Sequence, residues 1–210
     1  NDTGLATLAK YADMFGLSEK SGIEIVEESP KVSDSDSVRS AIGQGTHIYS
    51  TSQLAKYVTG IANKGTVYDL TLLYKVTDIE GNTIKEYEPK VDNQITDIGK
   101  STFNLIHNGM NFMVEKDTRF NSVRQGGIQM AGKTGTAQLG NGSNNAIFIA
   151  FAPFEDPQIA IAVAVENAGF GSTWACPIAT LIIEQYLTGE IEREWLFERM
   201  VNANLIDNKE

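Results

Sequence analysis

Residues 128–165 read IQMAGKTGTAQLGNGSNNAIFIAFAPFEDPQIAIAVAV, a stretch in which three apolar segments alternate with two short links. The segments that we expect to be strands are residues 128–138, 145–152 and 158–165. The links are Gly140–Ser143 and Pro153–Pro157. Links this short require antiparallel neighbours, because a crossover between parallel strands needs about a dozen residues or more. The sequence therefore predicts a three-stranded antiparallel sheet.

The last strand and the helix after it predict how one face of this sheet is covered. The odd-numbered positions from Ile159 to Val165 carry isoleucine or valine, and the even-numbered positions between them carry alanine. Because side chains alternate between the two faces of a strand, one face consists of alanine. Such a face lets a helix approach closely, and we expect the helix Pro177–Leu187, which is followed by Gly189, to pack there. A charged helix over residues 191–201 is expected to close the chain.

Three further amphipathic helices are predicted upstream of the sheet. The first covers Gly4–Phe15, the second begins after Ser50 and ends at Gly65, and the third starts near Ser101. Ser50 and Gln53 fit a capping box, in which each side chain bonds a backbone amide at the start of the helix.

The segments between these helices are interpreted from their turn and strand signals. Residues 18–39 are polar and acidic and are expected to form a surface loop. Residues 66–77 and 83–87 are rich in β-branched and aromatic residues, and Glu80–Asn82 between them indicates a hairpin. Helices and antiparallel strands in separate runs place the chain in the α+β class.

Composition and charge exclude several classes of function. The 210 residues carry a formal net charge of −10, and no cluster of Lys and Arg interrupts the acidic excess, so nucleic acid is not an expected partner. The one cysteine, Cys176, excludes an internal disulfide, and His47 and His107 lack metal-ligand spacing. We expect neither a metal nor a cofactor. No apolar run in these residues is long enough to cross a bilayer.

Residues 127–134, GIQMAGKT, satisfy the Walker A pattern of P-loop NTPases letter for letter. That pattern binds phosphate only where a strand enters the loop and a helix follows the lysine. Here Lys133 is followed by Gly135 and Gly140, without a helical stripe between them. An antiparallel meander also conflicts with the parallel sheet of that fold, so a P-loop NTPase is kept only as a remote alternative.

The strand residues Lys133-Thr134-Gly135-Thr136 offer a different chemistry. The ammonium of Lys133 attracts a carboxylate and stabilises a nearby hydroxyl as it passes on a proton. The hydroxyls of Thr134 and Thr136 can hold the same carboxylate, while Gly135 leaves room for a substrate backbone along the strand. A backbone N–H can then point at a developing oxyanion. These properties suit acyl transfer on a peptide with a free carboxylate, although lysine on an edge strand is also a common protection against aggregation.

The sequence around this tetrad resembles the class B penicillin-binding proteins. Lys133-Thr134-Gly135 is the third of the three motifs of serine penicillin-recognising enzymes, after S-x-x-K and S-x-N. Further segments that resemble the family, in order along the chain, are Ile42–Gly45, Ser50–Gly65, Gly109–Met110, Gly132–Gln138, Phe148–Pro153 and Ala175–Pro177. The resemblance runs from about Tyr11 to Leu187.

This resemblance implies a partial serine β-lactamase/penicillin-binding transpeptidase fold, an antiparallel sheet packed by helices. It implies a peptidoglycan D,D-transpeptidase that acts on stem peptides, binds β-lactam antibiotics and works on the extracytoplasmic face of the membrane. Carried over onto the matching positions, Lys133 is the active-site lysine of the third motif. Thr134, Gly135 and Thr136 bind the substrate or drug, and the backbone N–H of Thr136 lies in the oxyanion hole.

Two of the three family motifs are missing from this sequence. No S-x-x-K occurs, and the one S-x-N, at Ser143, follows the third motif in a link where it indicates a turn. We therefore expect residues 1–190 to be the C-terminal part of the transpeptidase domain, followed by a charged tail over residues 191–210. The nucleophilic serine, the N-terminal half of the domain and an N-terminal membrane anchor are expected elsewhere in a longer protein. Apolar faces left without that half are expected to make the isolated chain dimerise or be marginally stable.

Other functions stay open at this point. A β-lactam sensor or a serine β-lactamase is the nearest alternative, although the glycine-glutamine loop Ile42–Gly45 and the helix after it favour the transpeptidase. A non-catalytic interaction module is a further alternative, because these residues lack the nucleophile. The sequence does not decide between a role in cell elongation, which sets cell shape, and a role in division.

Overall fold

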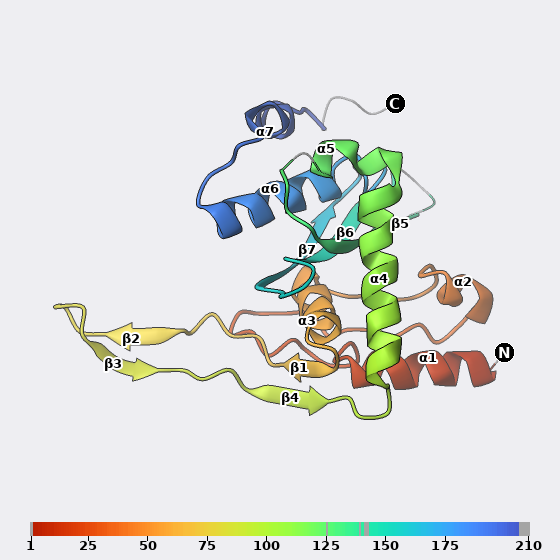
Figure 1. Ribbon diagram of the computed structural model, residues 1–210. Helices are drawn as coiled ribbons and strands as arrows, with labels where there is room; N and C mark the ends of the chain where they lie inside the picture. Colours follow the sequence, from red (N-terminus) through yellow and green to blue (C-terminus); the bar gives the residue numbers. More distant parts are fainter. Residues whose placement is uncertain (1, 125, 139, 141–142, 206–210) are drawn as a thin grey trace. The chain divides into compact units, whose positions relative to one another are not determined.

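The computed structural model describes residues 2–124, 126–138, 140 and 143–205 (Figure 1). The chain divides into two compact units, residues 1–97 and residues 98–210, which are called the first and the second unit below. None of the described helices is both long enough and apolar enough to cross a membrane.

The second unit is built on a three-stranded antiparallel sheet with the order β5-β6-β7. Its strands are β5 (Ala131–Ala137), β6 (Asn145–Ala152) and β7 (Ile159–Val165). The register places Thr134 opposite Phe148 and Ala150 opposite Ile161. The predicted sheet is thus confirmed, with β6 in its centre and β5 at an edge of the described strands. Residues 141 and 142 of the predicted first link lie outside the described residues.

Helix α6 (Ala175–Thr188) packs on the face of the sheet that carries Phe148. The buried cluster on this face includes Ala146, Ala150 and Ala152 of β6 and Ala175, Cys176, Ala179 and Ile183 of α6, with Ile159, Ile161, Val163 and Val165 of β7 packed against it. The expectation that α6 would use the alanine face of β7 is therefore wrong. The alanines of β6 and the small side chains of α6 let the helix approach the sheet closely. The large side chains of β7 then fill the remaining space in this core.

Helix α4 (Lys100–Lys116) packs against β5 and confirms the helix predicted near Ser101. The ring of its buried His107 lies 4.6 Å from the ring of Phe151, measured between centroids. Phe151 and Phe148 point to opposite faces of β6, because their positions differ by an odd number. Helices α4 and α6 therefore cover the two faces of the sheet.

The other helices of the second unit precede β5 or follow α6. They are η1 (Thr118–Phe120), α5 (Asn121–Arg124) and α7 (Glu194–Val201), the last of which confirms the predicted closing helix. Arg193, just before α7, forms a buried ion pair with Glu184 of α6, with Nε and Oε2 separated by 3.1 Å. This pair fixes the start of α7 on the helix that packs on the sheet.

The helices of the first unit are α1 (Asp2–Met14), α2 (Ser37–Ala41) and α3 (Thr51–Ala62). The hydroxyl of Ser50 accepts the N–H of Gln53 over 3.2 Å, and Gln53 Oε1 accepts the N–H of Ser50 over 2.8 Å, so the predicted capping box is confirmed. The predicted loop over residues 18–39 is wrong at its end, because α2 begins inside it. Asp36 accepts the N–H of Arg39 over 3.1 Å and starts a helix too short for a periodic pattern.

The strands of the first unit are β1 (Thr66–Tyr68), β2 (Lys75–Thr77), β3 (Thr83–Glu86) and β4 (Val91–Gln94). Strands β2 and β3 form the predicted hairpin, which projects away from the helices of its unit, whereas β1 pairs with β4 (Figure 1). A continuous strand over residues 66–77 is therefore wrong. Strand β1 ends at Tyr68. The next residue, Asp69, forms ion pairs with Lys56 and Lys90, with N–O distances of 3.1 and 2.6 Å. Strand β4 is mostly polar, and the sequence pattern does not predict it.

Candidate active-site strand

The four predicted site residues follow one another in the edge strand β5. Lys133 is exposed, whereas Thr134, Gly135 and Thr136 are half-buried. Because side chains alternate along a strand, Lys133 points to the opposite face from Thr134 and Thr136. The structure thus places the tetrad on one strand but divides its side chains between the two faces.

The outer edge of β5 is where both sets of side chains can meet a ligand. Within the described residues, β5 pairs with β6 alone. Every second residue of such an edge strand turns its backbone N–H and C=O away from the sheet. An extended peptide can therefore add to this edge as a further strand.

The side chain of Lys133 lies along its own strand. Its ammonium donates to the backbone carbonyl of Thr134, with Nζ and O separated by 2.7 Å. This bond keeps the positive charge beside the residues that follow in β5. The cation thus lies on the same strand as the hydroxyls of Thr134 and Thr136, which belong to the other face of the sheet.

Packing requires glycine at position 132 of β5 and leaves little room for a side chain at position 135. A Cβ on Gly132 would collide with the ring of Phe148, which is fully buried under the strand. A Cβ on Gly135 would lie 3.3 Å from Cβ of Ile147, which is tighter than an ordinary contact. The sequence predicts that Gly135 leaves room for a substrate, and in the structure its neighbour Ile147 also restricts this position.

A segment that the sequence analysis missed also reaches the tetrad. The β7–α6 loop, residues 166–174, brings Gly171 against the backbone carbonyls of Gly135 and Ile147. Phe170, beside it, is 65% exposed. The paired glycines around Phe170 are the signal that marks this segment, because glycine allows close backbone approach.

The structure also shows where the competing candidates lie. Lys133 is followed by strand as far as Ala137 and not by a helix, so the residues GIQMAGKT do not form a Walker A loop. Cys176 is fully buried, and burial raises the pKa of its thiol well above the ordinary value, so it is a core residue. His47 accepts the N–H of Ser33 through Nδ1, 3.1 Å away, in the first unit.

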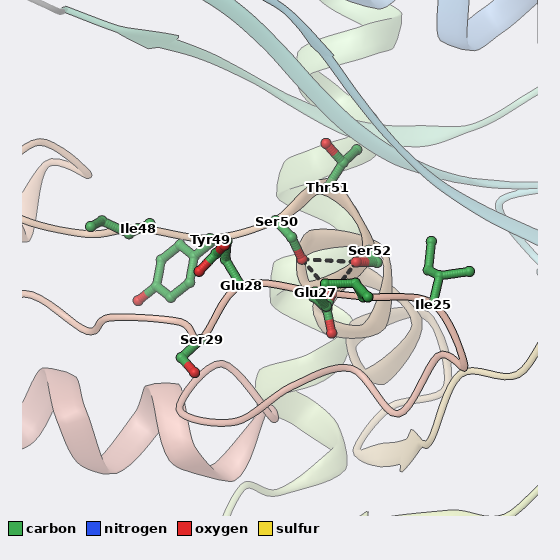
Figure 2. Close-up of a pocket in the computed structure, with 10 residues that line it drawn as sticks. Ile25, Glu27, Glu28, Ser29, Ile48, Tyr49, Ser50, Thr51 and Ser52 are labelled. Atoms are coloured by element: carbon green, nitrogen blue, oxygen red, sulfur yellow. Dashed lines mark hydrogen bonds between the residues drawn. The ribbon is translucent and has the colours of Figure 1, made fainter.

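One cavity of the first unit contains no predicted site residue (Figure 2). It measures about 560 Å³ and is lined by residues that include Ile25, Ile48 and Tyr49. Figure 2 shows Glu27 directed at the hydroxyls of Ser50 and Ser52, to which it is hydrogen-bonded. Burial opposes the charge on Glu27, but these bonds outweigh it and lower the pKa of the carboxyl. The carboxylate thus occupies the start of α3 as a structural group.

An antiparallel sheet packed by helices, with Lys-Thr-Gly-Thr on its edge strand, is the arrangement of serine penicillin-recognising enzymes. The family described as penicillin binding protein transpeptidase domain matches residues 1–184. The chain therefore belongs to this family, and its relatives place it among the class B penicillin-binding proteins.

Three relatives illustrate the match. Stage V sporulation protein D of Bacillus subtilis is 32% identical over 88% of this chain and 31% of its own length. The peptidoglycan D,D-transpeptidase MrdA of Haemophilus influenzae is 28% identical over 88% of this chain and 33% of its own length. The ceftriaxone acyl-enzyme complex of penicillin-binding protein A from M. tuberculosis has a TM-score of 0.73 and 25% identity, over 84% of this chain and 42% of that one. The chain spans about a third of the curated relatives.

Proposed function

We propose that this chain is part of a peptidoglycan D,D-transpeptidase that works on the extracytoplasmic face of the membrane and is acylated by β-lactams. The family membership supports the reaction class. The single observation that carries the proposal is the exposed Lys133 on the open edge of β5, followed by two threonines. This edge has the shape and the charge to receive an extended peptide that ends in a carboxylate.

In this proposal the stem peptide lies along the outer edge of β5. Its terminal carboxylate accepts hydrogen bonds from Thr134 and Thr136 and lies within the field of Lys133. Gly135 leaves the strand surface open to the peptide backbone. The backbone N–H of Thr136 then donates to the carbonyl oxygen of the penultimate D-Ala as that oxygen becomes negative.

The nucleophile is a serine outside these residues, because no S-x-x-K occurs in the sequence. Its oxygen forms a bond to the penultimate carbonyl carbon and its proton passes to a base. The C–N bond breaks, and the terminal D-Ala leaves as an amine after taking up a proton. An amine of a neighbouring stem then attacks the acyl-serine, which forms the cross-link and restores the serine. A β-lactam undergoes the same first attack, but its leaving amine stays attached.

Release of D-Ala by the full-length protein tests the proposal. Lys133→Ala is expected to slow release from a pentapeptide stem by about 100-fold, a loss typical of removing a group that stabilises developing charge. The matched control is Lys116→Ala, which removes another exposed lysine of the second unit, at the end of α4. The control is expected to release D-Ala at the wild-type rate. Wild-type release by Lys133→Ala would show that β5 is not the active-site strand.

A further inference from the structure

The β7–α6 loop is tied down on both sides of Gly171. The N–H of Asn167 donates to the side-chain oxygen of Asn145 over 3.0 Å, and the N–H of Gly169 donates to the carbonyl of Asn144 over 2.8 Å. On the other side, the carbonyl of Gly171 accepts the N–H of Cys176, in the first turn of α6, over 2.8 Å. The loop is therefore fixed between the start of β6 and the start of α6.

Between these two anchors, Gly171 lies close to the backbone of Gly135 in the tetrad. A Cβ built on Gly171 would lie 2.6 Å from the carbonyl oxygen of Gly135 and would collide with the carbonyl oxygen of Ile147. Both are backbone atoms of paired strands, so they cannot move aside as the end of a flexible side chain would. Gly171 is not in the left-handed region, in contrast to Gly169 with a φ of 86°. Space alone therefore requires glycine at this position.

The Gly135 oxygen, which a Cβ at position 171 would meet, is part of the peptide group that would form the oxyanion hole. The carbonyl of Gly135 and the N–H of Thr136 belong to one peptide plane, which is rigid and trans. In a trans peptide, the C=O and the N–H point in opposite directions. A contact that limits where the Gly135 oxygen lies therefore also limits where the Thr136 N–H points.

We propose that Gly171 is a positioning residue for the oxyanion hole. The inference rests on the proposed function, which assigns the Thr136 N–H to that hole. Gly171 does not touch the substrate. It holds the plane of the Gly135–Thr136 peptide so that the N–H is directed outward from the edge of β5 before the substrate arrives, and such preorganisation is what makes oxyanion donors effective. A side chain at position 171 would tilt this plane and misdirect the donor.

The test measures acylation of the full-length protein by benzylpenicillin at several drug concentrations, which separates the acylation rate constant from reversible affinity. Gly171→Ala is expected to lower the rate constant about tenfold or more and to leave reversible affinity within about twofold of wild type, because an oxyanion donor acts mainly in the transition state. The matched control is Gly109→Ala, since a Cβ on Gly109 would meet nothing within 4 Å. The control is expected to keep both constants.

Two results with Gly171→Ala would overturn the inference. One is a wild-type acylation rate constant, and the other is a parallel loss of affinity and rate, as general disruption would give. Asn145→Ala covers the case in which Gly171→Ala does not fold, because it removes one anchor of the loop without adding a methyl group. It is expected to slow acylation about threefold with affinity kept, in line with one weakened hydrogen bond. An unchanged rate would overturn the inference. A wild-type protein that is not acylated would refute the proposed function itself.

Discussion

At the scale of single residues, Lys56 on α3 is the most deeply buried charged residue described in the first unit. Its side chain is completely buried, and Nζ lies 3.1 Å from Asp69 and 2.9 Å from Asp92. Burial opposes the charge on Lys56, but the hydrogen bonds to Asp92 and Asp69 outweigh it and raise the pKa of the ammonium. Its stem also fills the space beside Gly16, where a Cβ would lie 2.9 Å from Cε. The lysine therefore joins α3 to the β1–β4 strands and to the end of α1.

This network predicts a pH dependence of stability. Burial acts against ionised Asp69, but bonds from Lys90 and Lys56 prevail and lower the pKa of its carboxyl. A carboxyl with a lowered folded pKa stabilises the fold above its unfolded pKa of about 4 and loses that effect as pH falls through the folded value. The free energy of unfolding, measured in urea, should therefore fall below about pH 4 in the wild type.

The substitution Asp69→Asn tests the assignment. It should cost roughly 2 kcal/mol at pH 7 and make stability less dependent on pH in the acid range. The control is Asp97→Asn, which removes an exposed carboxylate 3.8 Å from Lys10 and should change stability by less than about 0.5 kcal/mol. Equal acid sensitivity in wild type and Asp69→Asn would contradict the assignment.

The sequence predicts local residue chemistry better than it predicts long-range contacts. The motif Lys133–Thr136 can be recognised in the sequence, because its four residues are contiguous. The role of Lys56 depends on carboxylates 13 and 36 positions away, at Asp69 and Asp92. Gly171 likewise meets Gly135 only after the sheet has formed. No local pattern contains these contacts, so the structure is needed to find them.

At the scale of elements, the start of α3 allows a direct test. Ser50 caps the helix and also donates to Glu27, whereas Ser52 bonds Glu27 without capping. Ser50→Ala should therefore lower the free energy of unfolding by about 1 kcal/mol more than Ser52→Ala does, which is the usual value of a serine cap. Urea unfolding of both variants measures this difference. Equal losses would show that Glu27, and not the cap, accounts for the effect.

The elements that the sequence predicts are those with strong local signals. The antiparallel sheet follows from its short links, and the β2–β3 hairpin follows from its turn. Helix α2, with 5 residues, is too short to show a period, and polar β4 lacks a strand signal. The face used by α6 could not be read from β7 alone, because the alanines of β6 decide how closely the helix approaches. The alternation in β7 is thus identified correctly, but tertiary packing decides which of its two faces α6 covers.

At the scale of the whole molecule, the chain spans about a third of its curated relatives and leaves large apolar side chains uncovered. Exposed examples are Leu72 on the segment before β2, Ile84 on β3, and Leu105 and Phe112 on α4. Apolar surface of this kind favours association. The 210 residues expressed alone are therefore expected to dimerise or to unfold at a low, concentration-dependent temperature. Light scattering and melting at several concentrations measure this. A single monomer with a sharp, concentration-independent transition would contradict the expectation.

We propose that β5 is the third-motif strand of a serine transpeptidase whose nucleophile lies outside these residues. Covalent labelling of the full-length protein with a fluorescent penicillin, followed by mapping of the labelled peptide, tests it most directly. We predict that the protein is labelled, that the modified serine lies outside residues 1–210, and that Lys133→Ala slows labelling by about 100-fold. A label within residues 1–210, for example on Ser143, or a full-length protein that takes no label at all, would contradict the account.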